Sequence, residues 1–177
     1  MTQIISTAED ALPTSPQNLM DTLRDLGIDF KFYEHEAVFS VEESSKIKLD
    51  MPGTHCRNLF LRDKKKKMFL VVLANETQVN LKQLETTLEC GRLSFGSADR
   101  LWKYLGVKPG SVCPFAAIND TDHSVEIILD ADMMSADLVN YHPLLNTMTV
   151  GLTPSDLLRF FAHTGHSPKI KDLKESA

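Results

Sequence analysis

The stretch CRNLFLRDKKKKMFLVVLA, residues 56–74, decides the fold of this chain. Its two apolar ends, residues 56–62 and 68–74, each have the length of a strand. Asp63 and the lysines at 64–67 lie between them and are typical of a hairpin tip. Apolar runs of this kind predict two central strands that are buried on both faces.

Helix signals lie on both sides of this hairpin. Capping residues followed by apolar side chains at helical spacing predict helices at 16–27, from Val41, at 81–91, at 98–106 and at 154–165. Short strands are expected at 30–33, 116–118, 125–129 and 147–152, with the second and third forming another hairpin. Hairpins mixed with helices indicate an α+β (mixed α/β) domain rather than a regular βαβ series.

The length of 177 residues suits one domain. Residues 1–15 lack periodicity and predict a flexible N-terminal arm, residues 16–167 form the predicted domain, and residues 168–177 read as a charged, loose tail.

Composition and charge exclude several classes of protein. Hydrophobic residues make up 42% and charged residues 24%, as in ordinary globular proteins. No apolar run approaches the ~20 residues that span a bilayer, and the first ten residues do not resemble a secretory signal. Three scattered cysteines do not form a disulfide framework, so we expect a cytoplasmic protein. With a net charge of −5, contact with nucleic acid should be local, and neither a membrane nor DNA is an expected partner.

Motifs that catalyse reactions unaided are missing from the sequence. It has no HExxH, CxxC, GxSxG, GxGxxG or Walker pattern, so we expect no metal and no cofactor. His163 and His166 are better explained as helix-end histidines than as zinc ligands. Cys113 could be a thiol nucleophile, although any buried cysteine gives the same pattern. The lysine run 64–67 is either a solvated hairpin tip or a phosphate-binding patch.

Four segments together resemble the freestanding editing-domain family of prolyl-tRNA synthetase, the YbaK-like group. They are FYEHEAVFSVEES (32–44), GTHCRNLFLRDKKKKMFLVVL (53–73), LGVKPGSVCPFAAIND (105–120) and YHPLLNTMTVGLTPSDLLRFF (141–161). The branch that looks most similar is ProXp-ala, also called PrdX. The motifs NLFLRDKK, PGSVxPF and HPLxN occur here in the family's order and spacing.

This resemblance implies a single YbaK-like domain with a mixed, mostly antiparallel sheet flanked by helices. It also implies an aminoacyl-tRNA deacylase that proofreads translation by cleaving the ester of mischarged Ala-tRNA(Pro). Such an ester is already activated, so it requires a positioned water and donors for the oxyanion. In the family, the terminal hydroxyl of the tRNA assists the reaction. The implied partners are the acceptor end of tRNA(Pro) and prolyl-tRNA synthetase.

The resemblance assigns catalytic roles to Arg57 and to His142 of the HPLxN motif. Arg57 stands where the family has an essential lysine; it keeps the charge but cannot act as a neutral base, so an electrostatic role is expected. The implied substrate pocket comprises Asn58, Phe39, Ser40, Gly110, Ser111, Val112, Cys113, Pro114, Phe115 and Asn146. The implied tRNA-binding residues are Arg62, Lys64, Lys65, Lys66 and Lys67.

Two departures from the family pattern leave other functions open. Cys113 stands where threonine is expected, and Glu36 stands where proline is usual. The substrate could therefore be another small mischarged aminoacyl-tRNA carrying serine, threonine or cysteine. If Arg57 cannot replace the lysine, the chain would instead be a non-catalytic module that binds tRNA or the synthetase.

Overall fold

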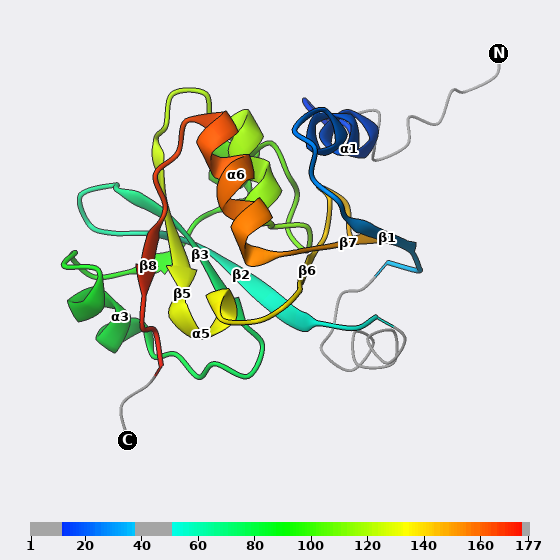
Figure 1. The fold of residues 1–177 in the computed structure, drawn as a ribbon. Coiled ribbons are helices and arrows are strands. Elements are labelled where there is room, and N and C mark those ends of the chain that lie inside the picture. The colour runs from blue at the N-terminus through cyan, green and yellow to red at the C-terminus, as the bar shows by residue number, and fades with distance from the viewer. Residues whose placement is uncertain (1–11, 38–50, 175–177) are drawn as a thin grey trace, which may run out of the picture.

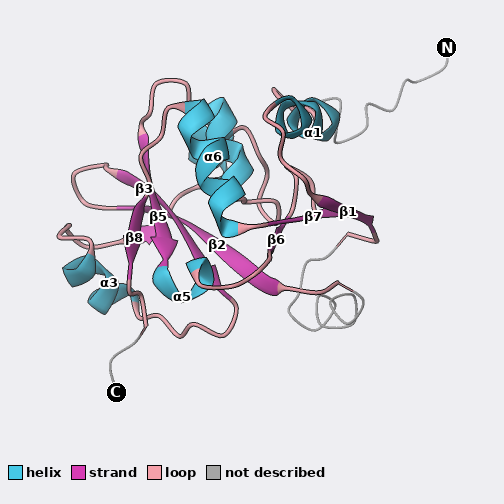
Figure 2. Ribbon diagram, viewed as in Figure 1, coloured by secondary structure: helices cyan, strands magenta, loops and turns pink. Residues whose placement is uncertain are grey.

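A computed structural model describes residues 12–37 and 51–174, and one mixed sheet forms its centre. The strand order is β1-β7-β6-β2-β3-β5-β8 (Figures 1 and 2). The short strand β4 pairs with β2. The strands are β1 (Lys31–Glu34), β2 (Thr54–Arg62), β3 (Met68–Ala74), β4 (Ser94–Phe95), β5 (Val125–Asp130), β6 (Val139–Tyr141), β7 (Met148–Leu152) and β8 (Lys169–Lys171). The helices are α1 (Pro16–Asp25), α3 (Leu81–Thr87), α4 (Ala98–Leu105), the 3-10 helix η1 (Pro114–Asn119), α5 (Ala131–Met134) and α6 (Pro154–Thr164).

The predicted hairpin is confirmed as β2 and β3. They pair antiparallel from Cys56↔Ala74 to Arg62↔Met68. Every residue of β3 is buried, as expected, but most of β2 is only half-buried. The prediction was wrong for β2 because only part of its other edge is covered: β6 pairs it at Thr54 and His55, and β4 pairs it at Leu61 and Arg62.

Capping explains where the helices begin and end. The side chains of Ser15, Asn80, Ser97 and Thr153 each accept a backbone N–H in the first turn of α1, α3, α4 and α6. Helix α3 ends at Thr87, before the predicted boundary near Gly91, because Glu89 already adopts a left-handed conformation (φ 52°). The helix expected from Val41 lies outside the described residues.

Two hydrophobic clusters cover opposite faces of the sheet. The large core contains residues of α1, α4, η1 and α6, including Leu19, Leu105, Phe115 and Phe160. The small core contains Leu84 of α3 with the alternate residues of β2 and β3 such as Leu61 and Leu73. Because side chains alternate along a strand, neighbouring residues of β2 belong to different cores.

The second predicted hairpin is wrong. Residues 116–118 belong to η1 rather than to a strand, because Pro114 takes the first helical position and the following side chains pack into the large core. Strand β5 is present as expected, but it pairs parallel with β3. Sequence periodicity placed the apolar run correctly and could not give its partner.

Both ends of the described chain are better packed than expected. Lys169–Lys171 pairs parallel with β5 as β8, and Leu173 is buried in the small core, so the tail is not loose up to that point. Near the N-terminus, Thr14 donates a hydrogen bond to Asn119 Oδ1 (2.6 Å). Within residues 12–37 and 51–174, no helix has the length and apolar character needed to cross a membrane.

Candidate functional site

The two predicted catalytic residues lie where β2 and β6 separate. The two strands pair in parallel only at Thr54↔Val139 and His55↔Asn140. Arg57 lies two residues beyond the last pair on β2, and His142 lies two residues beyond it after β6. We call this place the fork. The register therefore puts Arg57 and His142 at matching positions on its two arms.

His142 is held by backbone and by a second histidine. Its Nδ1 lies 2.7 Å from the carbonyl oxygen of Met148, so this nitrogen carries a hydrogen and donates it. The ring of His35 packs edge-on against the His142 ring, with centroids 5.9 Å apart. His35 in turn contacts Glu36 O through Nδ1 (2.7 Å) and Thr149 Oγ1 through Nε2 (2.8 Å).

Sequence reasoning did not select His35 as a site residue. The available signal was its place at the start of the FYEHEAVFSVEES segment. Only the pairing of β1 with β7 brings it beside His142, which lies 107 positions further along the chain.

Arg57 is anchored to the loop that follows β3. Its Nη1 donates to the carbonyl oxygen of Asn75 (2.9 Å), and its Nη2 donates to that of Thr77 (2.7 Å). Arg57 lies opposite Leu73, so it is on the small-core face of β2. Two N–H groups of a guanidinium that has five are thus used for orientation.

Asn58 lies on the other face of β2, opposite Val72 of the large core. Its Oδ1 is buried and has no hydrogen-bond partner among the described residues. A buried acceptor left unpaired costs about 1–3 kcal/mol, so this oxygen is suited to receive an N–H or O–H from a ligand or water.

The predicted pocket loop 110–115 runs from the surface into the large core. Gly110 is exposed with φ 90°, Ser111 is buried and Val112 is half-buried. Pro114 begins η1, and the Phe115 ring packs edge-on against Tyr141 at 5.9 Å. The loop therefore reaches the end of β6, next to His142.

Cys113 is fully buried in the large core. Burial raises the pKa of its thiol to about 11. A thiol of this kind is not a nucleophile at neutral pH. Cys113 instead belongs to the large core, which also contains Leu144 of the segment after His142.

The segment after His142 has a constrained backbone. Leu144 is buried with a left-handed φ of 74°, and its N–H bonds to the carbonyl of His142 (3.0 Å). Non-glycine residues rarely adopt this conformation, and such strain is concentrated at functional sites. Asn146, the last residue of the HPLxN motif, is also buried. Phe39 and Ser40 lie outside the described residues.

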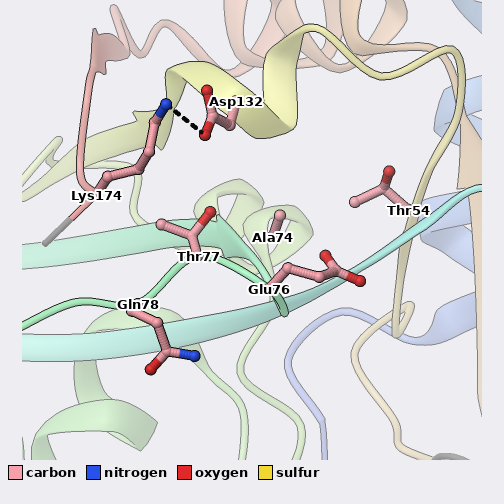
Figure 3. A pocket seen from close by; sticks show the side chains of 7 residues that line it. All are labelled: Thr54, Ala74, Glu76, Thr77, Gln78, Asp132 and Lys174. Atoms are coloured by element: carbon pink, nitrogen blue, oxygen red, sulfur yellow. Dashed lines mark ion pairs between the residues drawn. The ribbon is translucent and has the colours of Figure 1, made fainter.

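A cavity of about 390 Å³ lies beside the loop that anchors Arg57. Figure 3 shows Lys174 and Asp132, joined by an ion pair of 3.3 Å, across the cavity from Thr54 and from Glu76 of the 76–78 loop. Thr77 of that loop donates to the buried Asp130 (2.6 Å). None of the residues predicted for the substrate pocket lines this cavity.

The lysine run divides into two groups at the hairpin tip. Lys64 and Lys66 line a cavity of about 360 Å³ together with Arg62, Arg92 and Ser94. Lys67 instead forms an ion pair with Glu126 (2.8 Å), whose hydrogen bond raises the pKa of Lys67. Arg92 was not predicted, because it becomes a neighbour of Arg62 only through the pairing of β4 with β2.

Within the described parts of the chain, no group of three or more His, Cys, Asp or Glu residues is placed to hold a metal ion. The site's polar groups are therefore a guanidinium, two imidazoles, an unpaired amide oxygen and a backbone loop. Such groups can bind a carboxylic ester, a phosphate group and a water molecule.

Known proteins match this chain over the residues that form the candidate site. A sequence model of the aminoacyl-tRNA editing domain matches residues 35–160. The chain is 35% identical over 158 residues to the prolyl-tRNA editing protein ProX of Acetoanaerobium sticklandii, covering 89% of this chain and 96% of that protein. It is 37% identical over 157 residues to the prolyl-tRNA synthetase associated domain-containing protein 1 of Bos taurus, covering 86% and 91%.

A solved structure supports the fold. A crystal structure proposed to be that of a trans-editing enzyme for prolyl tRNA synthetase matches with a TM-score of 0.69, over 91% of this chain and 97% of that one. At 19% sequence identity, this likeness shows the fold alone.

The mixed sheet and the matched residues define an enzyme of the aminoacyl-tRNA deacylase class, which hydrolyses carboxylic esters. The chain belongs to the aminoacyl-tRNA editing domain family. Both arms of the fork, the histidine pair and the basic hairpin tip lie within the matched residues 35–160.

Proposed function

We propose that this protein edits tRNA(Pro) in trans by hydrolysing the ester of wrongly attached alanine. The observation that carries the proposal is the 35% identity to a prolyl-tRNA editing protein over 96% of that protein's length. Water adds to the ester carbonyl, the bond to the terminal ribose oxygen breaks, and that oxygen takes up the proton. The products are free alanine and tRNA(Pro).

Arg57 has an electrostatic role in this proposal. A guanidinium stays protonated and therefore cannot remove a proton from water. The carbonyls of Asn75 and Thr77 orient it, which leaves N–H groups for the phosphate of the terminal nucleotide. The terminal hydroxyl of the tRNA supplies the assistance that the protein lacks.

His142, Asn58 and the 110–115 loop would surround the ester. The hydrogen bond from Nδ1 of His142 to the Met148 carbonyl fixes the orientation of the ring, which would face the substrate or form part of the pocket wall. The unpaired Oδ1 of Asn58 suits a substrate N–H or the water. Backbone N–H groups after Gly110 are the proposed oxyanion donors.

Selectivity would depend on size. A pocket that accepts alanine gains only ~1–3 kcal/mol per methyl group over a smaller side chain, whereas proline is excluded by its ring. We therefore expect the protein to release alanine from Ala-tRNA(Pro) and to leave Pro-tRNA(Pro) intact.

The acceptor end of tRNA(Pro) is the proposed partner, with prolyl-tRNA synthetase as a second one. Arg62, Lys64 and Lys66 would contact phosphates from the cavity at the hairpin tip, with Arg92 added by the structure. Lys65 and Lys67 complete the basic surface. The three free cysteines suit the reducing cytoplasm as the site of this reaction.

The test measures alanine release from Ala-tRNA(Pro) by the purified protein. We expect Arg57→Ala to lower the rate at least about 10²-fold, the usual effect of removing one such donor. Arg24→Ala, which removes an exposed arginine of α1, is the control and should leave the rate unchanged. No hydrolysis of any small mischarged tRNA(Pro) by the intact protein would contradict the proposed activity.

A second substrate class has a specific observation in its favour. Cys113 is fully buried in the predicted pocket loop, where it offers a weak thiol donor in place of the hydroxyl of the expected threonine. A panel of aminoacyl-tRNAs decides: if alanine ranks below serine, threonine or cysteine, the substrate is one of these instead.

The remaining alternative is a binding module without activity. Arg57→Lys distinguishes it, because a large gain in hydrolysis would identify arginine as a disabling residue. No gain in a protein that is already active would exclude that alternative.

A further inference from the structure

Phe95 is an apolar side chain whose position the large and small cores do not explain. It is 64% exposed, the highest value among the exposed large hydrophobic residues of the described chain. It belongs to neither hydrophobic cluster. A scattered exposed residue needs no explanation, so its surroundings decide whether it has a role.

The backbone that carries Phe95 is held on both sides. In the two-residue strand β4, Phe95 pairs with Leu61 and Ser94 pairs with Arg62. The next residue, Gly96, donates its N–H to the carbonyl of Phe60 (2.8 Å). A side chain at Gly96 would meet the Phe60 ring at 2.5 Å, so the main chain here lies directly against that ring. Phe95 is thus exposed on a rigid support.

Phe95 also lies on the path between the two parts of the proposed tRNA site. Among the described residues, no strand pairs with the edge of β2 away from β3 between the β6 pairs at Thr54 and His55 and the segment around Phe60 to Arg62 that β4 and Gly96 cover. The fork is at one end of that edge, and Phe95 is at the other end, next to the basic cavity. Because Phe95 opposes Leu61, it shares the small-core face of β2 with Arg57.

The spacing suits RNA. Leu61 lies four positions after Arg57 on β2, which corresponds to about 13 Å at about 3.3 Å per residue. Stacked nucleotides advance by about 3.4 Å each, so a few nucleotides cover this distance. Unpaired bases are recognised mainly by stacking on aromatic rings held beside basic groups.

We propose that Phe95 is a stacking platform for a base of the unpaired 3′ end of the tRNA, upstream of the nucleotide that carries the amino acid. This inference rests on the proposed function. It assigns Phe95 a binding role that is separate from the chemistry at the fork.

The experiment is equilibrium binding of uncharged tRNA(Pro) by the full-length protein. Phe95→Ala should weaken binding about fivefold or more, the lower end of the range for loss of one base–aromatic stack. Phe95→Trp should bind at least as tightly as the original protein, and its fluorescence should be quenched by tRNA. Phe32→Ala removes another exposed phenylalanine, 40% exposed on β1, and should bind normally.

A second measurement separates this inference from the proposed activity. On an alanyl ester of adenosine alone, which has no upstream base, Phe95→Ala should match the original protein in kcat/KM. If the original protein cleaves neither substrate, the proposed activity fails, while the binding comparison still tests Phe95.

Equal tRNA affinity for Phe95→Ala, Phe32→Ala and the original protein would overturn the inference. So would a loss of affinity in Phe95→Ala that appears only with purified prolyl-tRNA synthetase, because Phe95 would then be a protein contact.

Discussion

Asp120 and His166 form a buried pair whose disruption should be strongly destabilising. Their side chains are 2% and 3% exposed, and Asp120 Oδ2 lies 3.0 Å from His166 Nε2. Asp120 also accepts the backbone N–H groups of Ser124 and Val125, each at 2.9 Å. The pair joins the turn before β5 to the end of α6. The other ring nitrogen of His166, Nδ1, contacts the hydroxyl of Thr164.

Asp120→Asn is the informative change, because it keeps the shape and removes the charge. In the native protein, both carboxylate oxygens of Asp120 accept N–H groups. In either orientation, the asparagine amide therefore places its NH2 group, which is itself a donor, against an N–H donor. Breaking a buried pair from one side costs about 3–5 kcal/mol. For a domain of this size, each kcal/mol corresponds to about 2–4 °C in Tm, so we expect a fall of about 6–20 °C.

The sign of the pH dependence follows from the pKa of Asp120. Burial raises it, but the hydrogen bonds from His166, Val125 and Ser124 outweigh burial and hold it below the ordinary 3.8. The stabilisation by the carboxylate is therefore complete above pH 3.8 and is lost as the pH falls through the lower folded value. The difference in stability between the original protein and Asp120→Asn should narrow only below about pH 4.

Urea unfolding from pH 3 to 7, with thermal melting at pH 7, measures both effects. Asp122→Asn changes an exposed aspartate in the same turn and is the matched control. A loss of less than about 1 kcal/mol for Asp120→Asn at pH 7, or a loss equal to that of Asp122→Asn, would refute the reasoning.

Three further outcomes are expected. Glu126→Gln removes the carboxylate that joins the hairpin tip to β8, and should cost no more than about 1 kcal/mol in urea unfolding because both lysine partners are exposed. Cys90 should react with a thiol reagent in the native protein while Cys113, fully buried with its pKa raised to about 11, reacts only after unfolding; equal labelling rates would contradict this. Gly165→Ala places a side chain at φ 81° and 2.8 Å from the His123 ring, so it should lower stability by at least about 1–2 kcal/mol, and an unchanged Tm would argue against the strain.

Local chemistry in the sequence was enough to locate most elements. Ser15, Ser97 and Thr153 supply caps to the N–H groups of the first helical turn, and these contacts involve neighbours in the chain. The hairpin of β2 and β3 followed from two apolar runs with a charged connection between them. The motif resemblance identified the editing family from the sequence alone, and it named Arg57 and His142 as candidate site residues.

Tertiary pairing decided the rest, because sequence spacing does not show which strands become neighbours. The apolar run at 125–129 would form a strand whether it paired parallel or antiparallel with its neighbour, and only the tertiary packing made it parallel to β3. His35 meets His142 through the pairing of β1 with β7, and Arg92 meets the lysines through β4. The hydrogen bonds that orient Arg57 come from a loop 18 and 20 residues away, so the sequence could name the cation while only the folded chain determined which way it points.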